Sequence, residues 1–272
     1  MLIFNCTKSA TEFFIRTIKG QKYSPIEPAT HKTIEASIQA QQQEIEVGSN
    51  LKDWHWLVHV ITVKRKKTII VMDYHSRFSM TFTGLKKGDE IAFLNMFDHH
   101  LGLHVQQLMQ MVIDDEDYIE ESLDHYAAAH SGCTFHQRGD RSVQATTNDV
   151  AWYFDNNVDE NDYIPQDYEL IKFDGFVNQL LRKNKNQKDY FSPHHEFLRN
   201  WLVDYSDCSD KEITQKINQF QQDEFDFYQQ ALKNDELETE IDTEETEQSL
   251  QSNSSNVINL DAFRKNAKPA KE

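Results

Sequence analysis

The fold of this chain is decided by the stretch WHWLVHVITVKRKKTIIVMDYHSRFSMTFTG, residues 54–84. Valine, isoleucine, threonine and aromatic residues dominate it, and such side chains pack well on a pleated, half-buried surface. A basic run at 64–67 and a polar run at 73–77 interrupt the pattern. We therefore expect three antiparallel strands, joined by two turns.

The first of these strands, residues 54–63, is largely apolar on both faces. Trp54 and Trp56 fall on one face, and Leu57 and Ile61 fall on the other, because successive side chains alternate across a strand. A strand covered on both sides needs helices or a second sheet packed over it, so we expect an interior strand. The third strand, residues 78–83, alternates apolar residues with serine and threonine, which predicts one apolar and one wet face.

The flanking segments predict further elements. Residues 1–6 alternate like a short opening strand, and Thr7 is a suitable N-cap for a helix after it. Asp89 is a suitable N-cap for a long helix whose apolar residues recur at spacings of three and four. That stripe consists of Ile91, Leu94, Phe97, Leu101, Val105, Leu108 and Val112. Similar patterns predict helices after Asp114, around residues 168–181, after Ser192-Pro193, and after Ser209, which opens a capping box.

The expected fold class is α+β. Residues 1–157 are expected to form one domain, with a small antiparallel β-sheet, a meander, that is covered by helices. Residues 158–233 are expected to form a helical extension. Residues 234–272 are expected to form a disordered acidic tail, because 235–247 holds eight acidic residues and is followed by QSLQSNSSN. Such a segment cannot bury enough apolar surface to offset its chain entropy.

The chain is acidic, with 28 Lys and Arg against 45 Asp and Glu and a formal net charge of −17. Direct binding to nucleic acid is therefore not expected unless a local basic patch overrides the repulsion. The basic run at 64–67 could contact a phosphate or an acidic partner, but a solvated turn is the favoured interpretation.

The compartment is expected to be the cytoplasm. The N-terminus lacks a basic region followed by an apolar core, and no apolar run approaches the roughly 20 residues of a membrane span. Cys6, Cys133 and Cys208 are odd in number and contain no CxxC, which fits a reducing compartment and no thiolate zinc site.

The most functional-looking loop is 138–142, because polar residues between structured segments are where binding groups are usually held. Its catalytic candidates, together with the preceding histidine, are His136, Asp140, Arg141 and Ser142. The competing interpretation is a turn salt bridge with Ser142 as a helix cap.

Other chemistry is poorly supported. His100 and His104 share a helix face and are weak candidates for metal ligands, but no third ligand is evident, so two histidines at the edge of a core are favoured. Adjacent His194 and His195 are expected to point apart. Cys133 would be a nucleophile only with a lowered pKa. No phosphate-cradling motif is present, so we expect no cofactor.

The order of three segments resembles a known family. These segments are FNCTK at 4–8, the strand-rich stretch from Asp53, and RSVQATTNDVAWYF at 141–154. The matching positions are Cys6, Thr7, Lys8, Trp54, His55, Arg141, Ser142, Val143, Asn148 and Asp149. This pattern is similar to the bacterial family called domain of unknown function 6933, although Gln144-Ala145-Thr146 replaces its small, glycine-containing segment. The resemblance covers about residues 1–157 and implies an architecture and a bacterial origin but no activity.

The end of the chain holds a short apolar island within Val257–Lys265. Its candidate binding residues are Val257, Ile258, Leu260, Phe263 and Arg264. Such an island after an acidic linker is either a peptide that docks on a partner or on its own domain, or a chance occurrence. We therefore expect a non-enzymatic binding or regulatory protein with a protein partner at this tail. The alternatives are a hydrolase or nuclease that uses the 136–141 loop, with or without a metal on His100 and His104, and an acidic decoy for a nucleic-acid-binding protein.

Overall fold

The structure is a computed structural model that describes residues 1–46, 52–183 and 189–253. It divides into two compact units, Met1–Phe220 and Gln221–Glu272. The first unit holds every strand of the described chain. The boundary between the units falls inside helix α8, Asp210–Asn253.

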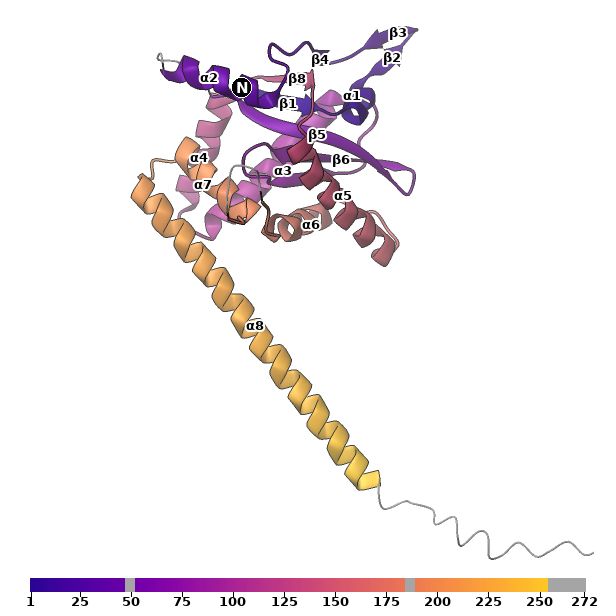
Figure 1. Cartoon of the computed structure of the whole chain (residues 1–272), viewed down its shortest axis with the longest axis vertical. Helices are drawn as coiled ribbons and strands as arrows, with labels where there is room; N and C mark the ends of the chain where they lie inside the picture. Colours follow the sequence, from indigo (N-terminus) through magenta and orange to yellow (C-terminus); the bar gives the residue numbers. More distant parts are fainter. Residues whose placement is uncertain (47–51, 184–188, 254–272) are drawn as a thin grey trace, which may run out of the picture. The chain divides into compact units, whose positions relative to one another are not determined.

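A six-stranded sheet in the order β4-β8-β1-β5-β6-β7 forms the centre of the first unit (Figure 1). The strands are β1 Leu2–Cys6, β4 Ile26–Glu27, β5 Trp54–Val63, β6 Lys66–Asp73, β7 Ser79–Phe82 and β8 Cys133–Gln137. As predicted, β5, β6 and β7 are antiparallel and β5 is an interior strand. A separate hairpin pairs β2, Arg16–Ile18, with β3, Gln21–Tyr23.

The prediction of a small, purely antiparallel meander is wrong. β1 pairs in parallel with both β5 and β8, and β4 pairs in parallel with β8, so the sheet is mixed. The sequence did not predict β8 at all. Parallel strands that neighbour each other in a sheet are joined by long crossovers and not by tight turns. No local turn residues therefore indicate such a pairing in the sequence.

Helices cover both faces of the sheet. One face carries Phe4, Trp56 and Val58 and packs against α1 Lys8–Phe14, α3 Glu90–Gln110, α4 Glu116–Ala129 and α7 Pro193–Tyr205. The opposite face carries Leu57 and Ile70 and packs against α2 Ile34–Glu46, α5 Arg141–Asn161 and α6 Tyr168–Gln179. Side chains that alternate along β5 therefore enter two separate cores, which is why both of its faces are apolar.

Three predicted helix starts are confirmed, because the side chains of Thr7, Asp89 and Asp115 each accept a hydrogen bond from a backbone N–H of the first turn. The predicted core stripe of α3 is partly wrong. Ile91 is 64% exposed, and Phe93 is buried in its place. The stripe was placed from apolar residues alone, whereas the buried face of α3 also includes two histidines.

The side of β7 that was predicted to be wet is buried beneath α6. Asn178 Oδ1 accepts from the Ser79 backbone N–H at 2.8 Å, and Asn178 Nδ2 donates to the Ser79 carbonyl at 2.8 Å. Two residues further along β7, Asp174 Oδ2 accepts from the Thr81 N–H at 3.0 Å. Side chains of α6 thus take the place of a seventh strand, and they satisfy the backbone groups that an edge strand leaves unpaired.

The segment that was predicted as a helical extension contributes α6 and α7, which belong to the first unit together with the sheet. Helix α8 continues to Asn253, past residue 234, where the sequence predicts order to end. Residues 254–272, with the predicted docking peptide, lie outside the described residues, so tail docking stays a prediction. Among the described helices, none combines the length and apolarity that crossing a bilayer requires.

Candidate functional site

A polar surface cavity of about 380 Å³ lies between α2, the β6–β7 turn and the start of α5. Its lining residues are Glu35, Ile38, Gln39, Gln42, Tyr74, His75, Arg77, Asp140, Arg141 and Ser142. They come from three segments that are far apart in the sequence. The volume falls within the range of small-molecule sites, about 300 to 1,000 Å³, and we refer to it as the α2–α5 cavity.

Asp140 is the N-cap of α5. Its Oδ1 accepts hydrogen bonds from the backbone N–H groups of Ser142 at 2.8 Å and Val143 at 3.1 Å. These amides have no partner inside the helix, so the carboxylate stabilises the helix start and fixes the direction of the loop before it. The sequence placed the cap at Ser142; the structure places it two residues earlier.

Arg77 is a fixed cation in the wall of the α2–α5 cavity. It is 7% exposed, its guanidinium donates to the Tyr74 carbonyl, and it lies 5.3 Å from the centre of the Tyr74 ring. Burial lowers the pKa of Arg77, while the charges of Asp73 and Asp140 act in the opposite direction. Burial, followed by the charge of Asp140, raises the pKa of Tyr74. Arg77, Tyr74 and Asp140 therefore form one coupled cluster.

Arg141 differs from Arg77 because it is exposed and forms no ion pair within the described part of the chain. It is the first residue of α5 and lines the α2–α5 cavity beside Ser142. The cavity thus holds one buried, engaged guanidinium and one exposed guanidinium that can turn toward a ligand.

Arg138 holds α2 in place. Its Nε donates to Asn5 Oδ1 at 2.5 Å, and one terminal nitrogen donates to the His31 carbonyl at 3.1 Å and to Ser37 Oγ at 2.6 Å. Burial lowers its pKa. Because these contacts join β1, the α2 segment and the loop after β8, Arg138 positions one wall of the cavity.

The structure brings Asp140, Arg141 and Ser142 together in the α2–α5 cavity but leaves His136 out of its lining. The Nδ1 of His136 lies 3.0 Å from the Glu27 carbonyl, and its Nε2 lies 3.2 Å from Thr134 Oγ1. Both ring nitrogens are therefore engaged at the edge of the sheet. Tyr74 and Arg77 were not predicted as site residues, because the polar run at 73–77 is typical of a turn.

The candidate metal ligands His100 and His104 are both buried. His104 Nε2 lies 3.4 Å from Asp174 Oδ2, and the His100 ring stacks on Phe82 with 4.9 Å between centroids. Burial lowers the pKa of His100 to about 4 and raises that of Asp174. The structure brings Asp174 of α6 to His104, but Asp174 already accepts a backbone hydrogen bond from Thr81. Among the described residues, His100, His104 and Asp174 do not form a group of ligands close enough together to hold one metal ion.

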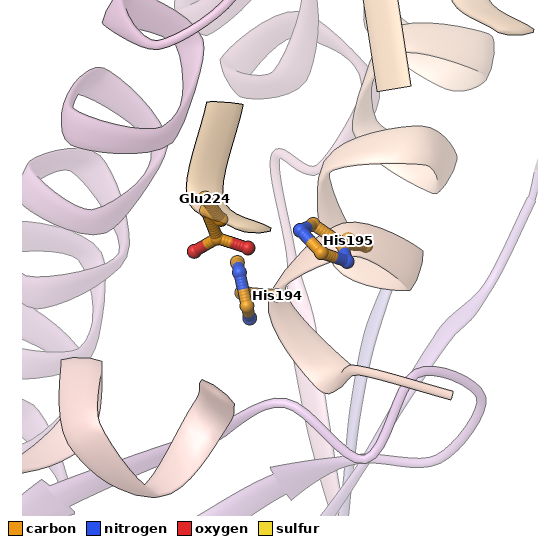
Figure 2. A group of neighbouring side chains, drawn as sticks. All are labelled: His194, His195 and Glu224. Carbon is orange, nitrogen blue, oxygen red and sulfur yellow. The ribbon is translucent and has the colours of Figure 1, made fainter. Parts of the chain in front are cut away.

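The prediction that His194 and His195 point apart is wrong. Their ring centroids lie 4.1 Å apart, and Figure 2 shows the two imidazoles beside each other at the start of α7. The Phe220 ring contacts both, at 5.4 and 4.9 Å. Helical spacing separates adjacent side chains, but here a shared aromatic neighbour packs against both.

Cys6 and Cys133 are poor nucleophiles. Burial raises the pKa of the fully buried Cys6, and burial followed by the charge of Asp98 raises the pKa of the half-buried Cys133. Both effects disfavour the thiolate, which is the reactive form.

Comparisons with curated proteins and with solved structures found no match. A comparison with family models found one, described as "Domain of unknown function (DUF6933)", over residues 4–196. This range extends the expected 1–157 through α5 and α6 to the first residues of α7, and it includes the whole lining of the α2–α5 cavity. Because the match covers more than half of the 272 residues, the chain belongs to this family of domains of unknown function.

Proposed function

We propose that this protein is a non-enzymatic binding protein whose α2–α5 cavity holds a small polar ligand with an anionic group. The observation that carries the proposal is Arg141, an exposed guanidinium without an ion pair in the described part of the chain, at a cavity with a second, fixed guanidinium in its wall. A guanidinium binds carboxylate or phosphate through two parallel hydrogen bonds, which supplies both affinity and orientation.

The rest of the lining supports a polar ligand and not an apolar one. Hydrogen-bond donors and acceptors surround the α2–α5 cavity. They come from Tyr74, His75, Ser142 and the two glutamines of α2. Glu35 would repel a second anionic group, so a ligand with a single anionic end and neutral polar atoms fits best.

Binding is favoured over hydrolysis because the residues that a hydrolase would need already have structural partners. Asp140 caps α5, and its charge adds to the effect of burial, which raises the pKa of Tyr74. His136 lies on β8 with both nitrogens engaged. A general base must lie within hydrogen-bond reach of the group that it deprotonates. His136 is absent from the cavity lining, and this separation argues against a catalytic pair.

The proposal is tested by titrating the full chain with small carboxylates and phosphates, inorganic phosphate and acetate among them, and measuring heat of binding. A charge-assisted hydrogen bond contributes about 1.5–3 kcal/mol, so we expect Arg141→Ala to weaken binding by roughly 10- to 150-fold. Arg65→Ala is the matched control, because it removes the same charge from the exposed β5–β6 turn. Equal losses in both variants, or no binding by any probe, would refute the proposal.

A hydrolase remains the second candidate, and two further variants test it. Hydrolysis of a phosphate ester or peptide by the wild-type chain, abolished by Asp140→Asn and His136→Gln alike, would replace binding by catalysis as the function. We expect no turnover.

A further inference from the structure

The charge of this chain is unevenly distributed along the sequence. Residues 1–88 contain 13 Lys and Arg and 7 Asp and Glu, a net charge of +6. Residues 89–220 contain 10 Lys and Arg and 25 Asp and Glu, a net charge of −15. Exposed charges interact over roughly one Debye length, about 8 Å at physiological salt, so a local surplus decides which partner a surface attracts.

Nine of the 13 basic residues fall in three short segments that contain no acidic residue, 16–23, 64–67 and 83–88. These segments are the β2–β3 hairpin, the tip of the β5–β6 hairpin and the loop between β7 and α3, and we refer to them together as the basic end. All nine basic side chains are exposed. Arg16 pairs with Glu90 and Lys64 with Asp162, whereas the other seven form no ion pair in the described part of the chain.

The three segments lie at one end of the sheet. β7 ends at Phe82, which neighbours Ile69 near the start of β6, so the loop after β7 leaves the sheet close to the β5–β6 tip. The same loop reaches the β2–β3 hairpin at Gly88, whose backbone N–H donates to the Phe13 carbonyl at 2.8 Å. A Cβ on Gly88 would lie 2.4 Å from the Cβ of Arg16, so glycine permits this close approach. Both hairpins extend toward the right of the view in Figure 1.

The tips of both hairpins hold basic residues in a backbone conformation that such residues rarely adopt. Each tip is a two-residue loop, Lys19-Gly20 in one hairpin and Lys64-Arg65 in the other. The φ angles of Lys19, Lys64 and Arg65 are 47°, 44° and 67°, in the left-handed region. Glycine, asparagine and aspartate are the usual residues at these positions of a hairpin. The backbone therefore does not account for a basic residue at both tips, whereas a partner would.

The sequence favoured a solvated turn at 64–67, of the kind that keeps an edge strand from pairing with another chain. In the structure, β5 and β6 are interior strands of the sheet. Their tip therefore protects no edge, and the basic run at 64–67 is left without this explanation.

We propose that the basic end binds the phosphate backbone of a nucleic-acid duplex. A duplex carries one negative charge per about 1.7 Å of its axis, so a single linear partner neutralises all three segments at once. The major groove of B-DNA also admits a two-stranded β-ribbon, which is the form of β2–β3. Contacts to phosphates do not read base sequence, so we expect binding that is independent of sequence. The acidic net charge argues against nucleic acid only where no local basic patch exists.

A nucleic acid fits the basic end better than an acidic protein does. A protein interface has an apolar centre surrounded by polar residues. Among the exposed side chains of the basic end, only Ile18 and Tyr23 are large and apolar, and both belong to the β2–β3 hairpin. The β5–β6 tip and the two lysines of the 83–88 loop offer charge alone, which suits a partner whose own surface is a row of charges.

This binding is independent of the α2–α5 cavity. The cavity lies beyond the opposite end of β6, and Lys66 to Tyr74 spans about 26 Å at about 3.3 Å per residue. A single exposed ion pair contributes little, so Arg65 alone is not expected to hold a free phosphate or carboxylate. Arg65→Ala therefore remains a control for the cavity ligand.

The test measures the fluorescence anisotropy of labelled DNA and RNA duplexes, two helical turns long, that are titrated with the full chain between about 50 and 200 mM salt. The double variant Lys19→Asn/Arg65→Asn removes one charge from each tip. Each lost phosphate contact reduces the slope of log affinity against log salt by about 1, so we expect a slope smaller by about 2 and affinity roughly tenfold lower or more at 100 mM salt. The urea midpoint should not fall, because asparagine tolerates the left-handed conformation. A loss of binding therefore cannot come from a loss of folding.

Lys172→Gln/Lys211→Gln is the matched control, because it removes two exposed lysines outside the basic end. It should leave duplex binding nearly unchanged, since charges more than a Debye length away are screened. Binding of either duplex with the expected loss in the tip variant supports the proposal. If neither duplex binds, or if the tip variant binds as wild type does, the proposal is refuted. Displacement of the duplex by poly-glutamate at equal charge concentration would make an acidic polypeptide the partner, and the proposal would fall.

Discussion

Asn178 is the residue whose loss should show most clearly that side chains of α6 complete the sheet. It is 1% exposed, and its amide exchanges two hydrogen bonds of 2.8 Å with the backbone of Ser79. Asn178→Ala would leave the N–H and the carbonyl of Ser79 buried without these partners. Each such group costs about 1–3 kcal/mol, so we expect the free energy of unfolding to fall by about 2–6 kcal/mol.

Urea unfolding followed by circular dichroism measures this change, provided that the slope with denaturant stays constant. Asn161→Ala is the control, because its amide donates only to the exposed carbonyl of Asn157 and its loss should cost about 0.5 kcal/mol or less. Asn178→Asp keeps the acceptor, loses the donor and adds a buried charge, so it should destabilise at least as much as alanine. A loss below about 1 kcal/mol for Asn178→Ala would show that β7 does not depend on α6.

Three further predictions concern other buried or capping groups. Burial lowers the pKa of His100 to about 4 in the folded chain, against about 6.5 unfolded, so stability is fully present above pH 6.5 and is lost as the pH falls toward 4. His100→Phe should lose less stability than wild type in urea titrations between pH 7 and pH 4.5; an equal loss contradicts the assignment. Asp140→Ala should lower the free energy of unfolding by about 1 kcal/mol through loss of the α5 cap, whereas Asp159→Ala within the same helix should change it little. Cys6 should react with a thiol reagent at pH 8 only after denaturant is added, because burial raises its pKa; fast reaction in the native chain would show that it is accessible.

Elements specified by neighbouring residues could be predicted from the sequence. The alternation along residues 54–83 gave the hairpins of β5, β6 and β7, and the caps at Thr7, Asp89 and Asp115 follow from short polar side chains before apolar runs. In each case the hydrogen bonds or side-chain contacts involved are local.

Elements that depend on distant residues could not be predicted. β1 lies between β5 and β8, which are about 50 and 130 residues away in sequence. The five residues of β8 do not indicate that this strand lies next to β1 in the sheet. A parallel strand is connected to its neighbours through long crossovers, so no nearby turn residues reveal the pairing. The same holds for Asp174, whose role depends on His104 and Thr81.

In the candidate site, too, the residues that are close in sequence could be predicted and the distant ones could not. Asp140, Arg141 and Ser142 are neighbours in sequence, and all three line the α2–α5 cavity. Arg77 and Tyr74 join them only because the β6–β7 turn lies over the start of α5. Sequence alone could therefore indicate one wall of the cavity but not the wall that holds its buried guanidinium.

Polarity in this chain is a poor guide to function until each polar group is matched with its partners. Arg138 was grouped with Arg141 in one loop, yet Arg138 donates to four acceptors in two other segments, while Arg141 has no ion pair in the described chain. If a side chain with hydrogen bonds inside the fold turned to bind a ligand, those bonds would break and the protein would lose stability. An exposed side chain without such bonds can bind a ligand at no cost of this kind. By this criterion Arg141 is the member of the loop best suited to meet a ligand, which is why Arg141→Ala, and not Arg138→Ala, separates binding from folding.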